Sequence, residues 1–101
     1  MKGPTLEYVR LMSAQINEMA QARGLRNVRV FGSVARGDAT VSSDLDLLVR
    51  PGAETSIFDL SGFMDETQEL LGLKVDVVSD RGPGPRMDQI RAEAVPLYQR
   101  A

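Results

Sequence analysis

The sequence predicts one small domain of the α/β or α+β class, and two observations support this expectation. Segments with apolar residues at three- and four-residue spacing, typical of helices, alternate with short β-branched runs, typical of strands. The chain has 101 residues, of which 43% are hydrophobic, so it has the length of one domain, residues 1–101, with a thin core. A thin core is often supplemented by a homo- or hetero-oligomer. The expected order is helix, strand, strand, helix, strand, helix.

The first half of the chain predicts a long helix and two strands joined by a short helical turn. Thr5 can cap a helix over residues 5–23 that stops at a glycine. The β-branched and aromatic run at residues 28–31 predicts the first strand. A short helical turn over residues 33–37 follows, and the alternation at residues 44–49 predicts the second strand.

The second half predicts a helix, a strand, a loop and a final short helix. The helix covers about residues 56–71, and the third strand covers residues 73–78. Residues 81–86 contain two prolines and two glycines, which oppose regular structure. The last helix covers about residues 87–95 and is expected to end before Pro96.

Composition excludes several kinds of chemistry. The chain has no cysteine and no histidine, so disulfides, thiolate or histidine metal sites and a histidine general base are all excluded. A net charge of -2 does not favour general nucleic-acid binding, which usually requires a basic face. The chain has no apolar run long enough to cross a membrane and no apolar core of a signal peptide. A cytoplasmic protein without membrane association is expected.

Two aspartates on the second strand are the first candidate site residues. Since strand residues two apart point to the same face, Asp44 and Asp46 share one face while Leu45, Leu47 and Val49 share the other. Two carboxylates at this spacing repel each other unless a cation lies between them, and a hard divalent ion such as magnesium prefers oxygen ligands. A solvated strand face explains the pair equally well, so both interpretations stay open on this evidence alone.

A third aspartate favours the metal interpretation. Asp76 lies in an otherwise apolar stretch of the third strand, where aspartate is disfavoured. If the third strand lies beside the second, Asp76 reaches Asp44 and Asp46 and completes a three-carboxylate cluster of the kind used in two-metal phosphoryl transfer. The alternative is an exposed strand face with Lys74 as its same-side neighbour.

A Gly-Ser pair before the aspartates is a candidate phosphate-binding turn. Gly32 removes a side chain where a phosphate would approach the backbone. Ser33 supplies a hydroxyl and backbone N–H groups at a helix start, where anions are favoured. Arg36, on the same turn, can stabilise phosphate charge or can equally pair with Asp38. A Gly-Ser pair alone usually marks only a turn, but its spacing from the aspartates makes the pattern specific.

The pattern resembles a known family. Residues 32–37 read Gly-Ser-Val-Ala-Arg-Gly, and residues 43–49 read Ser-Asp-Leu-Asp-Leu-Leu-Val. This is similar to the Gly-Ser, ten residues, Asp-x-Asp signature of the DNA polymerase beta-like nucleotidyltransferases, and in particular of their smallest branch, the minimal nucleotidyltransferases. The ending at residues 90–98, with Glu-Ala-Val-Pro-Leu-Tyr, is also similar to that branch, so the resemblance spans nearly the whole chain.

The resemblance implies a nucleotidyltransferase fold, in which a small mixed sheet of at least three strands is flanked by helices. It implies that Gly32 and Ser33 hold the triphosphate of ATP or another nucleotide, and that Asp44 and Asp46 ligate magnesium, with two ions expected. Asp76 would match the third carboxylate, which helps to bind the catalytic metal and deprotonates or orients the acceptor hydroxyl. The reaction implied is transfer of a nucleoside monophosphate with release of pyrophosphate.

The resemblance also implies a partner. Minimal nucleotidyltransferases are often encoded beside a HEPN-type toxin and act as the antitoxin by adenylylating a tyrosine of it. No separate domain for an acceptor is visible in these 101 residues, which favours a protein acceptor over a small molecule such as an aminoglycoside. The alternatives are a nucleotide- or toxin-binding module with little catalysis, and a small-molecule nucleotidyltransferase.

Overall fold

The computed structural model describes residues 3–98 and consists of a mixed four-stranded sheet with helices on both faces. The strands lie in the order β3-β2-β1-β4. Their bounds are β1 Leu25–Phe31, β2 Leu45–Pro51, β3 Val75–Ser79 and β4 Val95–Pro96. The helices are α1 Leu6–Leu11, α2 Ser13–Ala22, α3 Gly32–Arg36, α4 Ile57–Leu71 and α5 Pro85–Glu93. The predicted mixed α+β architecture is confirmed.

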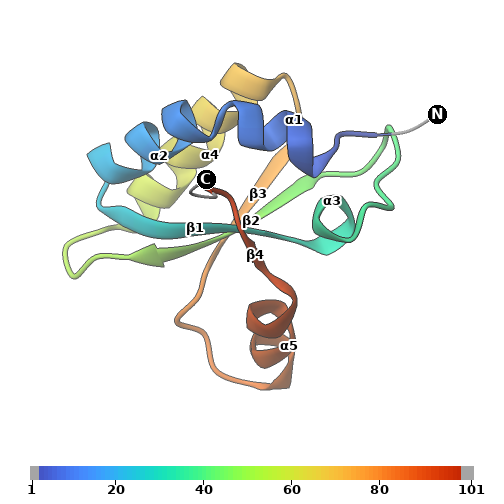
Figure 1. The fold of residues 1–101 in the computed structure, drawn as a ribbon. Helices are drawn as coiled ribbons and strands as arrows, with labels where there is room; N and C mark the ends of the chain where they lie inside the picture. Colours follow the sequence, from blue (N-terminus) through green and yellow to red (C-terminus); the bar gives the residue numbers. More distant parts are fainter. Residues whose placement is uncertain (1–2, 99–101) are drawn as a thin grey trace.

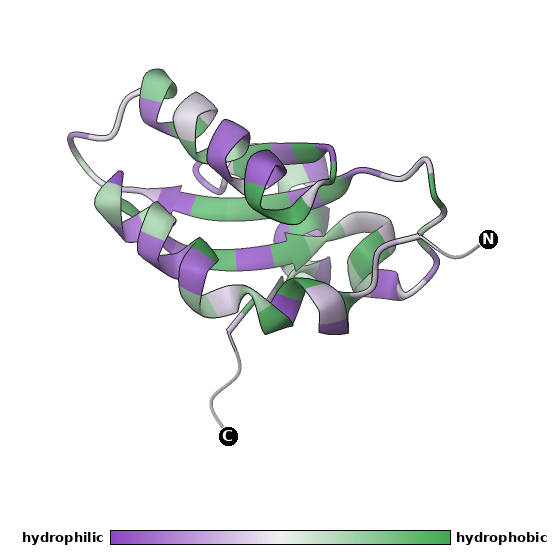
Figure 2. Cartoon of the chain, turned by 90° about the horizontal axis from the view of Figure 1, so that it is seen from above, coloured by the Kyte–Doolittle hydropathy of each residue, from purple (hydrophilic) through white to green (hydrophobic). Residues whose placement is uncertain are grey.

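The core lies between the sheet and three of the helices. Helices α1, α2 and α4 cover one face of the sheet, α5 lies below the other face, and α3 lies at one end (Figure 1). Seen from above, the strands are largely hydrophobic, with polar residues interspersed (Figure 2). The central strand β2 is the most buried, since Leu45, Leu47, Leu48 and Val49 are all fully inaccessible to solvent. Phe63 of α4 is also fully buried and packs in this core.

Strand direction brings together residues that are far apart in the sequence. β1 and β2 are antiparallel neighbours, with Phe31 opposite Asp46. β2 and β3 are parallel, as a helical crossover such as α4 permits, and Asp46 lies opposite Asp76. The short strand β4 pairs with the other edge of β1, with Val95 opposite Val30. The end of β1, the start of β2 and the segment after α5 therefore meet at one end of the sheet.

The strand bounds are shifted by up to three residues from those predicted, since β1 already begins at Leu25. The helices and the C-terminal segment differ from the sequence-based expectations at three further places. The first helix is broken at Met12, whose N–H bonds to the carbonyl of Val9, so α1 and α2 are separate helices. The last helix begins at Pro85, inside the predicted loop, because a proline at the first helical position sacrifices no hydrogen bond. The segment Val95–Pro96 is a strand, and its proline is tolerated because β4 lies at the sheet edge.

Within the part of the chain that the structure describes, no helix has both the length and the apolar character that a membrane crossing requires.

Candidate active site

The turn from β1 into α3 is shaped by a glycine that no other residue can replace without strain. Gly32 has a φ of 73°, a left-handed conformation that glycine adopts readily. A Cβ atom built on Gly32 would collide with Oδ2 of Asp46. The predicted phosphate turn and the predicted metal ligand are therefore in direct contact, which their separation in the sequence could only suggest.

The three predicted aspartates line one end of the sheet. Asp46 and Asp76 are directly paired residues on parallel strands, and Asp44 immediately precedes β2. Asp44 and Asp46 are half-buried and Asp76 is exposed. Within residues 3–98, no three acidic side chains close into a ready-made metal-ligand group, so the aspartates form an open row. We call Asp44, Asp46 and Asp76 the acidic row.

Electrostatics at the acidic row favour a cation. Burial raises the pKa of Asp46, and the nearby charges of Asp76 and Asp44 raise it further. Arg36 partly opposes this rise, and Glu93 adds to it. The donors are all carboxylate oxygens, the ligands that magnesium prefers, and magnesium usually takes only one or two protein carboxylates beside water and phosphate oxygens. The residues present therefore fit magnesium.

Ser33 lies in the first turn of α3. Its carbonyl accepts hydrogen bonds from the N–H groups of Gly37 and Asp38, each at 3.0 Å. Its hydroxyl forms no hydrogen bond with any residue between 3 and 98, so this group is free to bind a ligand. The Ser33 hydroxyl thus lies in the Gly32 turn without a structural role among residues 3–98, and its contact with a phosphate stays a prediction.

Arg36 lies at the end of α3 and is held by two carboxylates. Its Nε donates to Asp38 at 3.3 Å, and its Nη1 donates to Oε1 of Glu93 at 3.0 Å. The hydrogen bond and charge of Asp38, together with the charge of Glu93, raise the pKa of Arg36. The pairing with Asp38 that the sequence left open is present, and it leaves the Nη2 group of Arg36 uncommitted among residues 3–98.

Glu93 is the site residue that sequence reasoning did not single out. Its Oε1 accepts the N–H of Gly32 at 2.8 Å as well as the Arg36 guanidinium. The ending Glu-Ala-Val-Pro-Leu-Tyr was a signal for the family but gave no indication of where the glutamate lies. Only the pairing of β4 with β1 brings this side chain to the Gly32 turn.

Comparison with known proteins identifies the family. Residues 12–98 match the model of the nucleotidyltransferase domain. This chain belongs to that family.

The nucleotidyltransferase is similar to curated relatives and to solved structures. It is 36% identical to the protein adenylyltransferase MntA of Thermococcus cleftensis, over 73% of this chain and 76% of the relative. A solved structure of a candidate minimal nucleotidyltransferase is 40% identical, with a TM-score of 0.81 and coverage of 92% and 96% of the two chains. A chain from the Shewanella oneidensis complex of a tri-AMPylated HEPN toxin with an MNT antitoxin has the same fold, with 17% identity, a TM-score of 0.65 and coverage of 88% and 71%.

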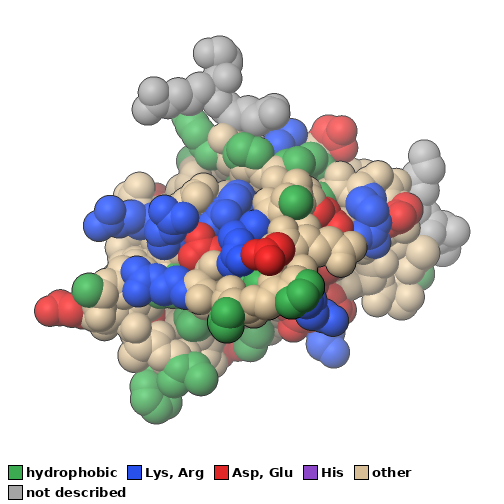
Figure 3. Space-filling model, turned by 90° about the horizontal axis from the view of Figure 1, so that it is seen from below, with side chains coloured by type: hydrophobic (Ala, Val, Ile, Leu, Met, Phe, Trp, Pro, Cys, Tyr) green, Lys and Arg blue, Asp and Glu red, His purple; other side chains and the backbone are tan. Residues whose placement is uncertain are grey.

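The nucleotidyltransferase has a differently built carboxylate at the other end of the sheet. Asp80, directly after β3, is buried, and its Oδ2 accepts hydrogen bonds from Arg29 at 2.5 Å and Arg50 at 3.2 Å. Arg91 of α5 donates to the Asp80 carbonyl oxygen at 2.7 Å. Arginine and lysine side chains are prominent on the underside of the molecule, the side on which α5 lies (Figure 3). We call Asp80 with Arg29 and Arg50 the arginine clamp.

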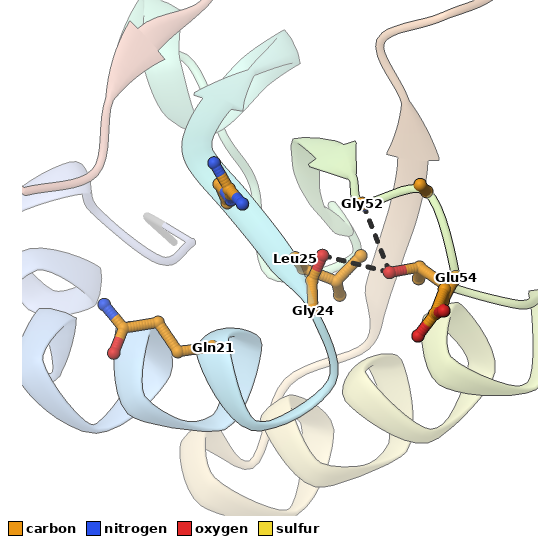
Figure 4. Close-up of a pocket in the computed structure, with 8 residues that line it drawn as sticks. Gln21, Gly24, Leu25, Gly52 and Glu54 are labelled. Atoms are coloured by element: carbon orange, nitrogen blue, oxygen red, sulfur yellow. Dashed lines mark hydrogen bonds between the residues drawn. The ribbon is translucent and has the colours of Figure 1, made fainter.

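A surface hollow also lies at that far end of the nucleotidyltransferase, away from the acidic row. It is lined by Gly24, Gly52 and Glu54 among others (Figure 4). The Thr55 hydroxyl joins its two sides, accepting the Gly52 N–H at 3.1 Å and donating to the Gly24 carbonyl at 3.0 Å. These bonds close the β2–α4 loop onto the end of α2, so the hollow is explained by loop closure.

Proposed function

We propose that this nucleotidyltransferase transfers AMP from ATP, with magnesium, to a tyrosine hydroxyl of a HEPN-type toxin and so acts as its antitoxin. The observation that carries the proposal is the contact between the Gly32 turn and Asp46, the member of the acidic row that is paired with Asp76. A phosphate-binding turn beside a row of carboxylates suits nucleotidyl transfer, because the turn would hold the triphosphate and the carboxylates would hold the magnesium that neutralises its charge.

Each site residue has a distinct role in this proposal. Gly32 lets the triphosphate approach the backbone, and the free hydroxyl of Ser33 binds a phosphate oxygen. The uncommitted Nη2 of Arg36 adds positive charge beside the phosphates. Asp44 and Asp46 hold the magnesium ions. When bound, magnesium lowers the pKa of the attacking hydroxyl and neutralises charge on the departing pyrophosphate.

The exposed carboxylate of Asp76 serves the acceptor. It would share in binding the catalytic metal. It also accepts the proton of the incoming tyrosine hydroxyl or orients that hydroxyl for attack. The tyrosine oxygen forms a bond to the α-phosphorus of ATP. At the same time the bond between that phosphorus and the oxygen linking it to the β-phosphate breaks, and pyrophosphate leaves. The exposure of Asp76 supports this role, because a protein acceptor must approach from solvent.

The relatives support a protein acceptor. The Thermococcus cleftensis relative is named a protein adenylyltransferase, and the toxin of the Shewanella oneidensis complex carries AMP groups. These are properties of those proteins. They make a HEPN-type protein the first acceptor to test for this chain.

The test is transfer of label from [α-³²P]ATP to a purified HEPN-type toxin. With magnesium, the wild type is expected to label the partner, and Asp44→Ala combined with Asp46→Ala is expected to reduce the rate by about 10³-fold or more. Asp65→Ala, an exposed acidic position on α4, is the matched control and should label normally. Replacing the acceptor tyrosine of the partner by phenylalanine should abolish labelling. Undiminished transfer by the double alanine variant would refute the assignment.

A further inference from the structure

The carboxylate of Glu93 makes two contacts that the proposed function does not explain. A single oxygen, Oε1, accepts both the Gly32 N–H at 2.8 Å and the Arg36 Nη1 group at 3.0 Å. These donors lie at the two ends of the five-residue helix α3. Glu93 therefore spans the segment that also carries Ser33.

The position of Glu93 follows from the short strand β4. Val95 lies opposite Val30 in an antiparallel pair, so continuing the register by two residues places Glu93 opposite Gly32. Leu97, just beyond β4, is fully buried and its N–H bonds to the Val28 carbonyl. The segment is thus anchored independently of Glu93, and the side chain is not required to hold β4 in place.

The helix α3 needs an acceptor from elsewhere. Phe31 precedes it at the capping position and provides no side-chain hydrogen bond, so the N–H of Gly32 would lack a partner at the start of the helix. Glu93 supplies that acceptor from α5, which buries none of its own residues. A neutral side chain could cap the helix equally well, but only a carboxylate also forms an ion pair with Arg36.

The carboxylate is costly at this place, which argues for a specific role. Glu93 adds negative charge next to Asp46, whose pKa it helps to raise. Placing a fourth acidic group near three aspartates destabilises the site unless the interaction with Arg36 compensates for it. Glu93 leaves the hydroxyl of Ser33 and the Nη2 group of Arg36 without partners among residues 3–98, so it holds the turn without occupying those phosphate donors.

We propose that Glu93 is a positioning residue of the nucleotidyl-transfer site, which orients the Gly32–Ser33 turn and Arg36 for the triphosphate. This rests on the proposed function, because the ligand to be positioned is the nucleotide. Glu93 acts through Gly32 and Arg36 and does not itself touch the nucleotide.

The test compares Glu93→Ala and Glu93→Gln with the matched pair Glu69→Ala and Glu69→Gln, at an exposed glutamate of α4. Binding of magnesium–ATP by calorimetry, Tm by circular dichroism and exchange of the Gly32 amide by NMR are measured. Glu93→Ala is expected to weaken magnesium–ATP binding about tenfold, the effect of one lost charge-assisted hydrogen bond, and to speed exchange of the Gly32 amide. Glu93→Gln keeps an oxygen for that amide but loses the ion pair, so exchange stays slow and binding falls about threefold.

Several outcomes would overturn the proposal. Tighter magnesium–ATP binding by Glu93→Ala would mean that the carboxylate competes with the phosphates. A lower Tm with unchanged binding would mean that Glu93 only stabilises the fold, and slow Gly32 exchange in Glu93→Ala would mean that the contact is not formed. If the wild type neither binds magnesium–ATP nor labels a partner, the proposed function fails and this role fails with it. If the wild type binds and Glu93→Ala binds equally well, only the role of Glu93 fails.

Discussion

The two ends of the sheet treat aspartate in opposite ways. In the arginine clamp, Asp80 is buried and shared by two arginines. In the acidic row, Asp46 and Asp76 are paired across β2 and β3 without such neutralisation. The nearby Arg36 is bound by two other carboxylates, those of Asp38 and Glu93. Asp46 of the acidic row and Arg50 of the arginine clamp both lie on β2. Their spacing along the strand separates the two environments by about 13 Å.

This difference distinguishes a carboxylate used for stability from one available for a ligand. The buried charge of Asp80 is hydrogen-bonded to an arginine on each of two strands and so links β3 to β1 and β2, and removing one partner of such a pair is costly. A row of like charges, half-buried at Asp44 and Asp46 and exposed at Asp76, weakens the folded state, and a bound cation would relieve the repulsion. An aspartate side chain is therefore expected to have opposite effects on stability at the two ends, and three measurements test this difference.

The largest expected effect is at the arginine clamp. Asp80→Ala leaves Arg29 and Arg50 without their shared acceptor and should lower the free energy of unfolding by about 3 kcal/mol, the lower end of the range for broken buried pairs because Arg50 is largely exposed. Urea unfolding at pH 7 measures this, with Asp65→Ala as the exposed control. Magnesium–ATP binding by the folded fraction should persist. A loss no greater than that of the control would show that the clamp is not a stability element.

The second effect is stabilisation of the acidic row by magnesium. At ten times its Kd, magnesium should raise the free energy of unfolding by about 1.4 kcal/mol, because the ion binds the folded row and relieves its repulsion. The measurement is Tm in magnesium compared with Tm in EDTA. Asp44→Ala combined with Asp46→Ala should lose this rise, whereas Asp65→Ala should keep it. An equal rise in the double variant would place the magnesium elsewhere.

The smallest effect is the pH dependence of Asp46 in metal-free buffer. Because burial, Asp76 and Asp44 raise the pKa of Asp46 above its ordinary 3.8, the folded state binds this proton more tightly than the unfolded state. The stability from that proton is complete below pH 3.8 and is lost as the pH rises through the raised pKa. Asp46→Asn should therefore be more stable than the wild type at pH 7, by less than about 1 kcal/mol.

The control for this prediction is the pH dependence itself. Below pH 3.8, where the wild-type carboxyl is protonated in both states, the two proteins should unfold at the same urea concentration. Asp80→Asn should be destabilising at pH 7, the opposite sign. If Asp46→Asn were destabilising at pH 7 as well, the two ends of the sheet would not differ in the way described.

Local patterns in the sequence predicted much of the fold and of the site. The period of two in the second strand correctly separated Leu45, Leu47 and Val49, which are buried, from Asp46. The spacing of the Gly-Ser pair and the aspartates predicted that these residues belong to one site, and Gly32 does contact Asp46. The strand prediction succeeded because alternation depends on neighbouring residues, whereas a shared functional site stays a prediction.

The structure alone decided the features that depend on partners distant in the sequence. β4 has only two residues, too few for any pattern, and it forms because an edge of β1 accepts it. The arginine clamp joins Arg29, Arg50 and Asp80 from three strands or strand ends. Their separation along the chain left no periodic signal by which they could be matched.

Residue types alone indicated which groups could do chemistry here: carboxylates on a strand, a glycine-serine turn and no histidine or cysteine. The contacts of Asp76 with its neighbour Asp46 across the strands, and of Glu93 with Gly32, came from the folded arrangement of the chain. This is because side-chain type is a local property of the chain. Strand order and register, in contrast, result from burying one shared core, and they set which distant charges meet.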